Sequence, residues 1–293
     1  MRLHVVDGTF ELYRAHFAPR PGHADRAGHD VKATVGVMAS LVTLLRDPDE
    51  AVTHLAVAFD NPIRSFRNDL YDGYKSDEGV PPELRAQFDL VEEAVRALGI
   101  TAWSMQEFEA DDALAAAAHR FAPVVEQVRL LTPDKDLGQC LQGTHVVQVD
   151  RIRRRVIDED ALRARRGITP AQVPDWLGLV GDSADGFPGL PGFGEKTATA
   201  LLQAFGTLER IPADAAAWPA GIRGAARLAT TLAEQREDAR LYRRLATLRT
   251  DAPVDEDLEA LRWRGPRSPA LDALCARLAV EDPLRGVVPR SGP

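Results

Sequence analysis

The sequence predicts an α/β protein with a mostly parallel sheet, followed by an all-helical part. Two observations carry this prediction. Short apolar or β-branched runs alternate with helical stretches over the first 150 residues, and beyond residue 166 the pattern changes to helices only. Alternating strands and helices are typical of a parallel sheet with helices on its faces.

Five runs have the composition of β-strands, and helical stretches separate them. The stretches 31–45 and 82–98 place apolar residues at helical spacing, after the first and second strands respectively. The strand runs are LHVVD (3–7), THLAVAFD (53–60), ITAWSM (100–105), VRLLTPD (128–134) and HVVQVD (145–150). In parallel sheets the ligand crevice lies outside the carboxyl ends of the strands, so residues at these ends are the first candidates for function.

Carboxylates follow the predicted strands at that edge. Acids in the first turn of a helix are stabilised by its macrodipole, which alone would account for those that open the stretch 108–121. Seven carboxylates at one edge would repel one another, however, and a divalent metal would supply the counter-charge. The seven are Asp7, Asp60, Glu109, Asp111, Asp112, Asp134 and Asp136.

The composition indicates a globular protein outside the membrane. Hydrophobic residues make up 45% and charged residues 27% of the 293 residues. No apolar run is long enough to cross a bilayer, and the chain enters its first strand without a signal-like segment, so we expect a cytoplasmic protein. Cys140 and Cys275 lack metal-type spacing and fit a reducing compartment.

The charge is unevenly distributed along the chain. A formal net charge of -8 would ordinarily count against a nucleic-acid partner. Basic clusters nevertheless occur in RIRRRV (151–156), RARR (163–166) and the helical stretch 223–249. A solvated face is the simpler interpretation of any one such cluster.

The helical part contains a glycine-rich turn. Thr169, Pro170 and Gln172 predict a capping-box start for its first helix. A glycine-rich segment follows and leads into a second helix near Glu195. Such a turn presents backbone N–H groups to an anion and would suit a DNA phosphate, although an ordinary loop is the commoner explanation.

Six stretches resemble, in order and approximate spacing, the motifs of the 5′→3′ exonuclease and flap-endonuclease family. The resemblance covers roughly residues 2–250, and the best-known relative is the N-terminal nuclease domain of bacterial DNA polymerase I. No polymerase follows in this sequence, so we expect a free-standing member. The stretches are VDGT (6–9), AFD (58–60), SFRNDLYDGYK (65–75), EADD (109–112), TPDKDL (132–137) and GDSADGFPGLPGFGEKTA (181–198).

The resemblance implies a fold and a division into domains. It implies a PIN-like α/β nuclease domain over residues 1–166 and a small all-helical helix–three-turn–helix domain that binds DNA over 167–250. We expect the C-terminal helix and tail, 251–293, to pack back on the core.

The resemblance also implies two metal sites. Asp7, Asp60, Glu109 and Asp111 match the acids that hold the first metal in the family. Other acids of the family hold the second metal, either directly or through water. The residues that match them are Asp112, Asp134, Asp136, Asp182 and Asp185. Mg²⁺ prefers oxygen ligands and keeps several waters, so an excess of acids suits a pair of Mg²⁺ or Mn²⁺ ions. Two such ions can stabilise both the attacking and the leaving oxygen of a phosphodiester displacement.

Further residues match DNA-contacting positions of the family. Arg14, Arg67 and Lys75 match basic residues that contact or polarise the scissile phosphate. Tyr74 resembles the aromatic residue beside that lysine, although packing is the simpler role for it. For Lys135, structural pairing and substrate contact both remain open. Gly192, Gly194 and Lys196 match the turn that holds one DNA strand in the family. The backbone carbonyls of that turn often bind K⁺.

One segment departs from the family. Where relatives usually have a basic residue soon after the YK motif, in an arch over the single-stranded 5′ end, this chain has Asp77 and Glu78. Acids there repel a phosphate chain, which argues against tight capture of long 5′ flaps, although Arg85 could compensate.

The function predicted from the sequence is a structure-specific 5′→3′ exonuclease and flap endonuclease of replication or repair. Its partner would be DNA with a 5′ flap, nick, overhang or 5′ end, bound without sequence preference by a nucleoid-associated monomer. The alternative is a DNA-junction-binding protein with little turnover. A PIN-like ribonuclease is disfavoured, because small enzymes of that class lack the second helical domain.

Overall fold

The computed structural model describes residues 1–290, which form two compact units. Of the described residues, the first unit comprises 1–65, 77–132 and 249–290, and the second comprises 66–76 and 133–248. The segment 133–166, which the sequence assigned to the nuclease domain, therefore clusters with the helical part. The last three residues of the expected tail lie outside the described residues.

The first unit is built on four parallel strands. They are β1 (Arg2–Asp7), β2 (His54–Asp60), β3 (Thr101–Met105) and β4 (Gln127–Leu131), in the order β3-β2-β1-β4. All seven residues of β2 are buried, which explains its continuous apolar run. Asp7 pairs with Ala58 and Asp60 with Met105, so β1 and β2 end at the same edge of the sheet.

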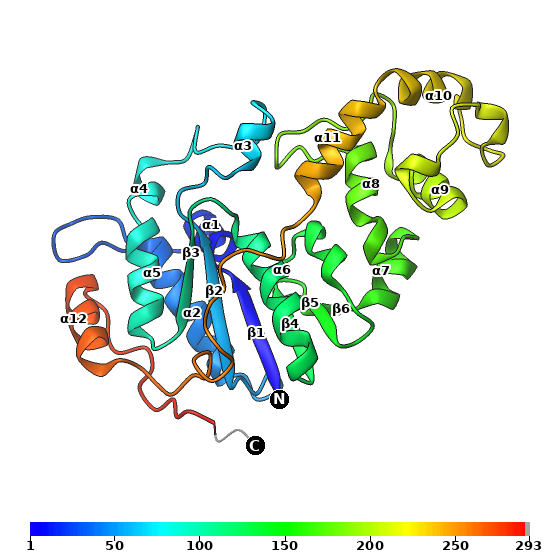
Figure 1. Ribbon diagram of the computed structural model, residues 1–293. Helices are drawn as coiled ribbons and strands as arrows, with labels where there is room; N and C mark the ends of the chain where they lie inside the picture. Colours follow the sequence, from blue (N-terminus) through cyan, green and yellow to red (C-terminus); the bar gives the residue numbers. More distant parts are fainter. Residues whose placement is uncertain (291–293) are drawn as a thin grey trace. The chain divides into compact units, whose positions relative to one another are not determined.

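Helices cover this sheet (Figure 1). The helical elements of the first unit are α1 (Gly8–Phe17), α2 (Lys32–Arg46), α4 (Pro82–Arg85), α5 (Phe88–Ala97), α6 (Ala110–Phe121), the 3₁₀ turn η1 (Ala122–Val124) and α12 (Ser268–Leu278). The alanine-rich helix α6 contacts all four strands, because small side chains let its backbone approach the sheet. The single helix expected over 82–98 is divided at Gln87, whose buried amide oxygen accepts hydrogen bonds from both the N–H and the hydroxyl of Thr34 at the start of α2.

The C-terminal segment belongs to the first unit. Leu55 N donates to Leu261 O at 2.9 Å, and Trp263 N donates to Thr53 O at 2.8 Å. The indole of Trp263 donates to Leu98 O at 2.9 Å, and α12 packs against α5. These contacts place the segment against β2 and α5. Within residues 1–290, no helix is long and apolar enough to span a membrane.

The second unit is mainly helical, with one β-hairpin. Its elements are α3 (Arg67–Leu70), η2 (Lys135–Cys140), β5 (Val146–Asp150), β6 (Arg155–Ile157), α7 (Glu159–Arg166), η3 (Pro170–Gln172), α8 (Val173–Val180), α9 (Glu195–Phe205), η4 (Leu208–Arg210), η5 (Ala215–Ala217), α10 (Ala225–Glu234) and α11 (Arg236–Ala246). The expected capping box of Thr169 and Gln172 is present, which confirms that prediction. Trp176 and Phe187 are the largest apolar side chains of its core that are almost fully buried.

The antiparallel pairing of β5 with β6 was not expected from the sequence. The basic run 151–156 forms the turn of this hairpin and most of β6. The sequence pattern does not predict this strand, because arginines occupy its exposed positions and the run has no alternation of apolar and polar residues. The hairpin therefore presents the basic cluster on a fixed scaffold.

Candidate metal centre

In the first unit, two acids stand at the ends of β1 and β2. Asp7 caps α1, since its Oδ1 accepts from Phe10 N at 2.8 Å, while its Oδ2 accepts from the hydroxyl of Thr132 at 3.0 Å. The Oδ1 of Asp60 accepts from Ala110 N at the start of α6, at 2.7 Å. Both side chains are largely buried. Backbone and hydroxyl donors thus fix two carboxylates at the sheet edge that the sequence predicted.

The EADD motif begins α6. Glu109 is the N-cap, and its Oε1 accepts from the hydroxyl of Ser65 at 2.6 Å. The carboxylate of Asp112 accepts from Glu109 N at 3.0 Å and from Arg249 N at 2.8 Å, and the residue is fully buried. Asp111 is only half-buried. The two backbone bonds of Asp112 support a role in holding the helix start, whereas Asp111 is better placed to meet a ligand.

In the second unit, three acids form a compact cluster. Oxygen atoms of Asp136, Asp182 and Asp185 lie within 4.8 Å of one another. Asp134 holds the backbone beside them, since its Oδ1 accepts from Asp136 N at 2.8 Å. Asp182 and Phe187 exchange backbone hydrogen bonds of 2.8 and 3.1 Å, which close the loop that carries Asp185. The structure therefore brings together three of the five acids predicted for the second metal.

The electrostatics of this cluster fit a cation. Burial and the neighbouring Asp134 raise the pKa of Asp136 to about 8. The Oδ1 atom of Asp136 is buried and has no hydrogen-bond donor within residues 1–290, although Lys135 Nζ lies 3.5 Å away. Lys135 also pairs with Asp182. A divalent cation would bind such a group of oxygens and restore the ionised form of Asp136.

Lys75 lies beside the cluster because its segment is docked there. Its Nζ is 3.0 Å from Asp185 Oδ1, and its backbone N donates to Asp185 O at 2.9 Å. Gly186 has φ +86°, and a Cβ atom at this position would overlap with Gly73 O. Tyr74 is buried in the core of the second unit and lies under the ammonium group of Lys75. These contacts support packing for Tyr74, and its DNA contact stays a prediction.

The two predicted arginines make protein contacts. Arg67 is only 1% exposed, and it donates to Leu245 O at 2.7 Å and to Thr247 O at 3.2 Å. Arg14 donates to Glu11 and, at 3.1 Å, to the hydroxyl of Ser40. The contacts of Arg67 support a structural role at the end of α11. A phosphate contact by either arginine stays a prediction.

The glycine-rich turn leads into α9 as the sequence predicted. Gly194 is the N-cap and makes no side-chain capping bond, and the helix begins at Glu195. Gly192 has φ +85°, a conformation that L side chains rarely adopt. Gly194 and Lys196 are both exposed. The turn therefore offers N–H groups and one cation to an anion, which is the geometry of a phosphate contact.

The arch segment carries an ion pair. Arg85, which could have offset the acids of the arch, is bonded to Asp77. The Arg85 guanidinium lowers the pKa of the Asp77 carboxyl. The positive charge of Arg85 is thus shared with a carboxylate of the same segment.

Ser65, Thr132 and Gly186 were not singled out from the sequence, although each lies in a quoted motif. The two hydroxyls hold Glu109 and Asp7, and the glycine allows the close approach of the Lys75 segment. Hydroxyl residues are common in motifs, so only their bonds reveal what they do.

Two family matches cover most of the chain. Residues 2–167 match the 5′-3′ exonuclease N-terminal resolvase-like domain, and residues 168–269 match the 5′-3′ exonuclease C-terminal SAM fold. The chain belongs to the 5′-3′ exonuclease family.

Curated relatives agree with this assignment. DNA polymerase I of Bacillus caldotenax is 38% identical over 216 residues, which are 72% of this chain and 24% of that protein. A 5′-3′ exonuclease of Aquifex aeolicus is 32% identical over 210 residues, which are 71% of either chain. The match thus spans about a quarter of the polymerase and over two thirds of the exonuclease.

Two solved structures share the fold of this chain. Bacteriophage T5 5′-exonuclease, solved with zinc ions, has a TM-score of 0.64 at 16% identity, covering 97% of this chain and 96% of that one. The catalytic core of Rad2 in complex with DNA substrate has a TM-score of 0.64 at 16% identity, covering 98% and 92%. The predicted fold, a PIN-like nuclease domain with a helical second domain, is confirmed.

Proposed function

We propose that this protein is a divalent-metal-dependent, structure-specific 5′→3′ exonuclease and flap endonuclease that hydrolyses DNA in replication or repair. The observation that carries the proposal is the compact cluster of Asp136, Asp182 and Asp185, in which the first two are buried and the pKa of Asp136 is raised to about 8. Family membership and a relative named 5′-3′ exonuclease support the same activity.

The acids of each unit suit one ion of a Mg²⁺ or Mn²⁺ pair. Asp7, Asp60, Glu109 and Asp111 would hold one ion, and Asp136, Asp182 and Asp185, supported by Asp134, would hold the other. The ions would activate water and stabilise the leaving oxygen. We assign Asp112 a positioning role, because its oxygens accept from two backbone N–H groups.

The remaining residues would bind and orient the DNA. Lys75, fixed beside Asp185, would neutralise a phosphate oxygen next to the metal ligands. The turn at Gly192, Gly194 and Lys196 would contact a backbone phosphate without reading sequence, and K⁺ would bind its carbonyls. The substrate would be a nick, overhang, 5′ end or short 5′ flap, bound by a monomer in the cytoplasm at the nucleoid.

Cleavage of a labelled 5′-flap duplex tests the proposal. We expect product with Mg²⁺ or Mn²⁺ and none with EDTA. Asp182→Asn should lower the rate at least about a hundredfold, since a lost charge-stabilising group costs that order. Asp160→Asn is the matched control, because it removes an exposed acid in the first turn of α7. Equal rates for Asp182→Asn and the parent would refute the metal-site assignment.

A second candidate, a DNA-junction-binding protein with little turnover, is favoured by the pairing of Arg85 with Asp77. That pairing reduces the positive charge available to a threaded strand. A gel shift of the same duplex separates the candidates: a shift without product under either metal would favour the binding protein.

A further inference from the structure

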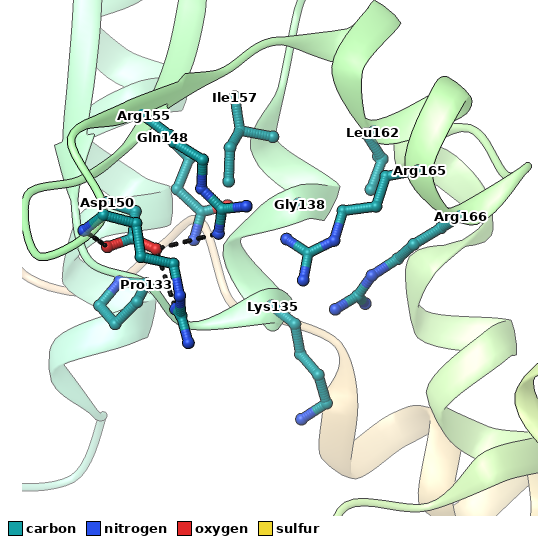
Figure 2. A pocket seen from close by; sticks show the side chains of 11 residues that line it. Pro133, Lys135, Gly138, Gln148, Asp150, Arg155, Ile157, Leu162, Arg165 and Arg166 are labelled. Carbon is teal, nitrogen blue, oxygen red and sulfur yellow. Dashed lines mark hydrogen bonds and ion pairs between the residues drawn. The ribbon is translucent and has the colours of Figure 1, made fainter.

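The second unit contains a pocket that the proposed metal centre does not use (Figure 2). It has a volume of about 70 Å³ and lies between the β5–β6 hairpin and α7. Five of its lining residues are cations and one is an acid: Lys135, Arg153, Arg155, Arg165, Arg166 and Asp150. The two basic clusters at 151–156 and 163–166, each of which alone suggested a solvated face, contribute to opposite walls of this pocket: Arg153 and Arg155 line one wall, and Arg165 and Arg166 line the other.

The acid in the pocket is already engaged by the hairpin. Asp150 is buried and accepts from Arg153 N at 2.9 Å, from Arg153 Nη1 at 3.0 Å and from Arg155 Nη2 at 3.2 Å. One carboxylate therefore serves two guanidinium groups on this wall. Lys135, at the base of the pocket, pairs with Asp182 and Asp136.

The opposite wall has no acid of its own in the pocket lining. Arg165 and Arg166 extend from the last turn of α7, and Figure 2 shows both guanidinium groups directed into the pocket, toward the side where Lys135 lies. The Nη1 atom of Arg166 is buried without a hydrogen-bond acceptor in the described part of the chain. Its guanidinium packs on the ring of Trp176, 5.0 Å from the centroid. Stacking on the indole fixes the group in place.

The positive charges of Arg165 and Arg166 lie close together, which indicates that the pocket would accept an anion. Burial and the adjacent Arg165 lower the pKa of Arg166, and the carboxylates of Glu195, Asp136 and Asp134, which act to raise it, offset this only in part. An anion between the two guanidinium groups would relieve this repulsion and give Arg166 Nη1 an acceptor. Guanidinium groups form a planar fork that matches phosphate oxygens in a bidentate manner, so phosphate is the chemistry that this wall fits best.

We propose that this pocket is a phosphate-binding site, in which Arg165 and Arg166 hold a backbone phosphate of the DNA substrate. The inference rests on the proposed function for its physiological ligand. The pocket shares Lys135 with the acid cluster, so a phosphate held there would be a neighbour of the phosphate at the metal ligands. The site would thereby position the strand that is cut.

Binding of a nicked duplex in EDTA, measured against salt concentration, tests the site. Arg165→Gln/Arg166→Gln should raise the Kd about tenfold and make the slope of log Kd against log salt shallower by about one, because one phosphate contact is lost. Arg163→Gln removes one positive charge from the exposed face of α7, where Arg163 pairs with Glu159, and should leave the slope unchanged; it is matched in charge to the single variant Arg165→Gln. Since Arg166 packs on Trp176, the exposed single variant Arg165→Gln repeats the test without altering that stacking.

A slope and Kd equal to those of the parent in both Arg165 variants would overturn the proposal. If the parent binds no DNA, the proposed function fails. Binding of inorganic phosphate then tests separately whether the pocket is a phosphate site. Thermal unfolding would then be followed during a phosphate titration at constant ionic strength. A rise in Tm for the parent and Arg163→Gln, but not for Arg165→Gln, would support a site for free phosphate, whereas equal shifts in all three would overturn it.

Discussion

At the scale of single residues, a residue can occupy a motif position of the family without making the contact that the family makes there. Arg67 stands in the SFR motif, where the family places a phosphate contact, yet its guanidinium is buried and bonded to the carbonyls of Leu245 and Thr247. A buried arginine that satisfies the last carbonyls of a helix contributes mainly to stability.

Arg67→Ala therefore distinguishes a structural role of Arg67 from a contact with the phosphate. We expect the free energy of unfolding to fall by about 2–4 kcal/mol, because buried carbonyls lose their donors. Urea denaturation would measure the loss, and Arg163→Ala, exposed on α7, should change it little. A variant as stable as the parent that cleaves flap DNA much more slowly would instead support the phosphate contact.

The sequence allowed the acids to be predicted but not their partners. Asp7 and Asp60 could be placed at one edge because they end apolar runs, and the strand register bears this out. The bonding of Asp112 to Arg249 N joins residues 137 positions apart, and no local pattern reports such a contact. The four pocket arginines were likewise visible only as members of two separate clusters, since their meeting depends on the unexpected hairpin.

At the scale of elements, one glycine allows the Lys75 segment to dock on the Asp185 loop. Gly186 combines a left-handed φ of +86° with close contact to Gly73 O. Gly206 has φ +84° with nothing near its Cβ position, so it serves as the matched control.

Gly186→Ala should displace Lys75 and reduce the rate of flap cleavage at least about tenfold, while Gly206→Ala should cost only about 1–2 kcal/mol of stability for the left-handed backbone. Single-turnover cleavage and urea denaturation of both variants give the comparison. Unchanged cleavage by Gly186→Ala would show that the position of Lys75 does not matter.

Glu50 links β1 and β4 at a place away from the acids of the candidate metal centre. His4 and Arg129 are paired in register, and both contact Glu50. Burial lowers the pKa of His4 from 6.5. For Glu50, burial acts to raise the pKa, but the hydrogen bonds from His4 and Arg129 outweigh it and lower the pKa to about 2.

These shifts predict acid sensitivity. Both folded pKa values lie below their unfolded values, so both groups stabilise the fold at neutral pH. The contribution of His4 is lost as the pH falls below about 6.5, and that of Glu50 as it falls from about 4.5 towards 2. Unfolding free energy measured against pH should show a weaker acid dependence below pH 4.5 in Glu50→Gln, but not in the exposed control Glu281→Gln. Parallel pH curves for Glu50→Gln and the parent would contradict this assignment.

At the scale of the whole molecule, the chain passes between the two units four times, at 65/66, 76/77, 132/133 and 248/249. The core of the second unit includes side chains from before residue 167, namely Tyr74, Leu141 and Leu162, beside those of α8 and α9. The boundary expected at 166/167 rested on the change from alternating strands and helices to helices only and on the family resemblance, and it stays a prediction, because such a pattern does not report which unit buries a given side chain.

Fragments test where the second unit can be cut. We expect residues 167–250 alone to lack a cooperative urea transition, because their core loses the side chains of Tyr74, Leu141 and Leu162. The fragment 133–248, which retains Leu141 and Leu162, should unfold more cooperatively and with a larger m-value, since m scales with the surface exposed on unfolding. If the two fragments unfold with the same midpoint and m-value, the segment 133–166 contributes nothing to that core, and the division at 166/167 describes the folding units of the chain.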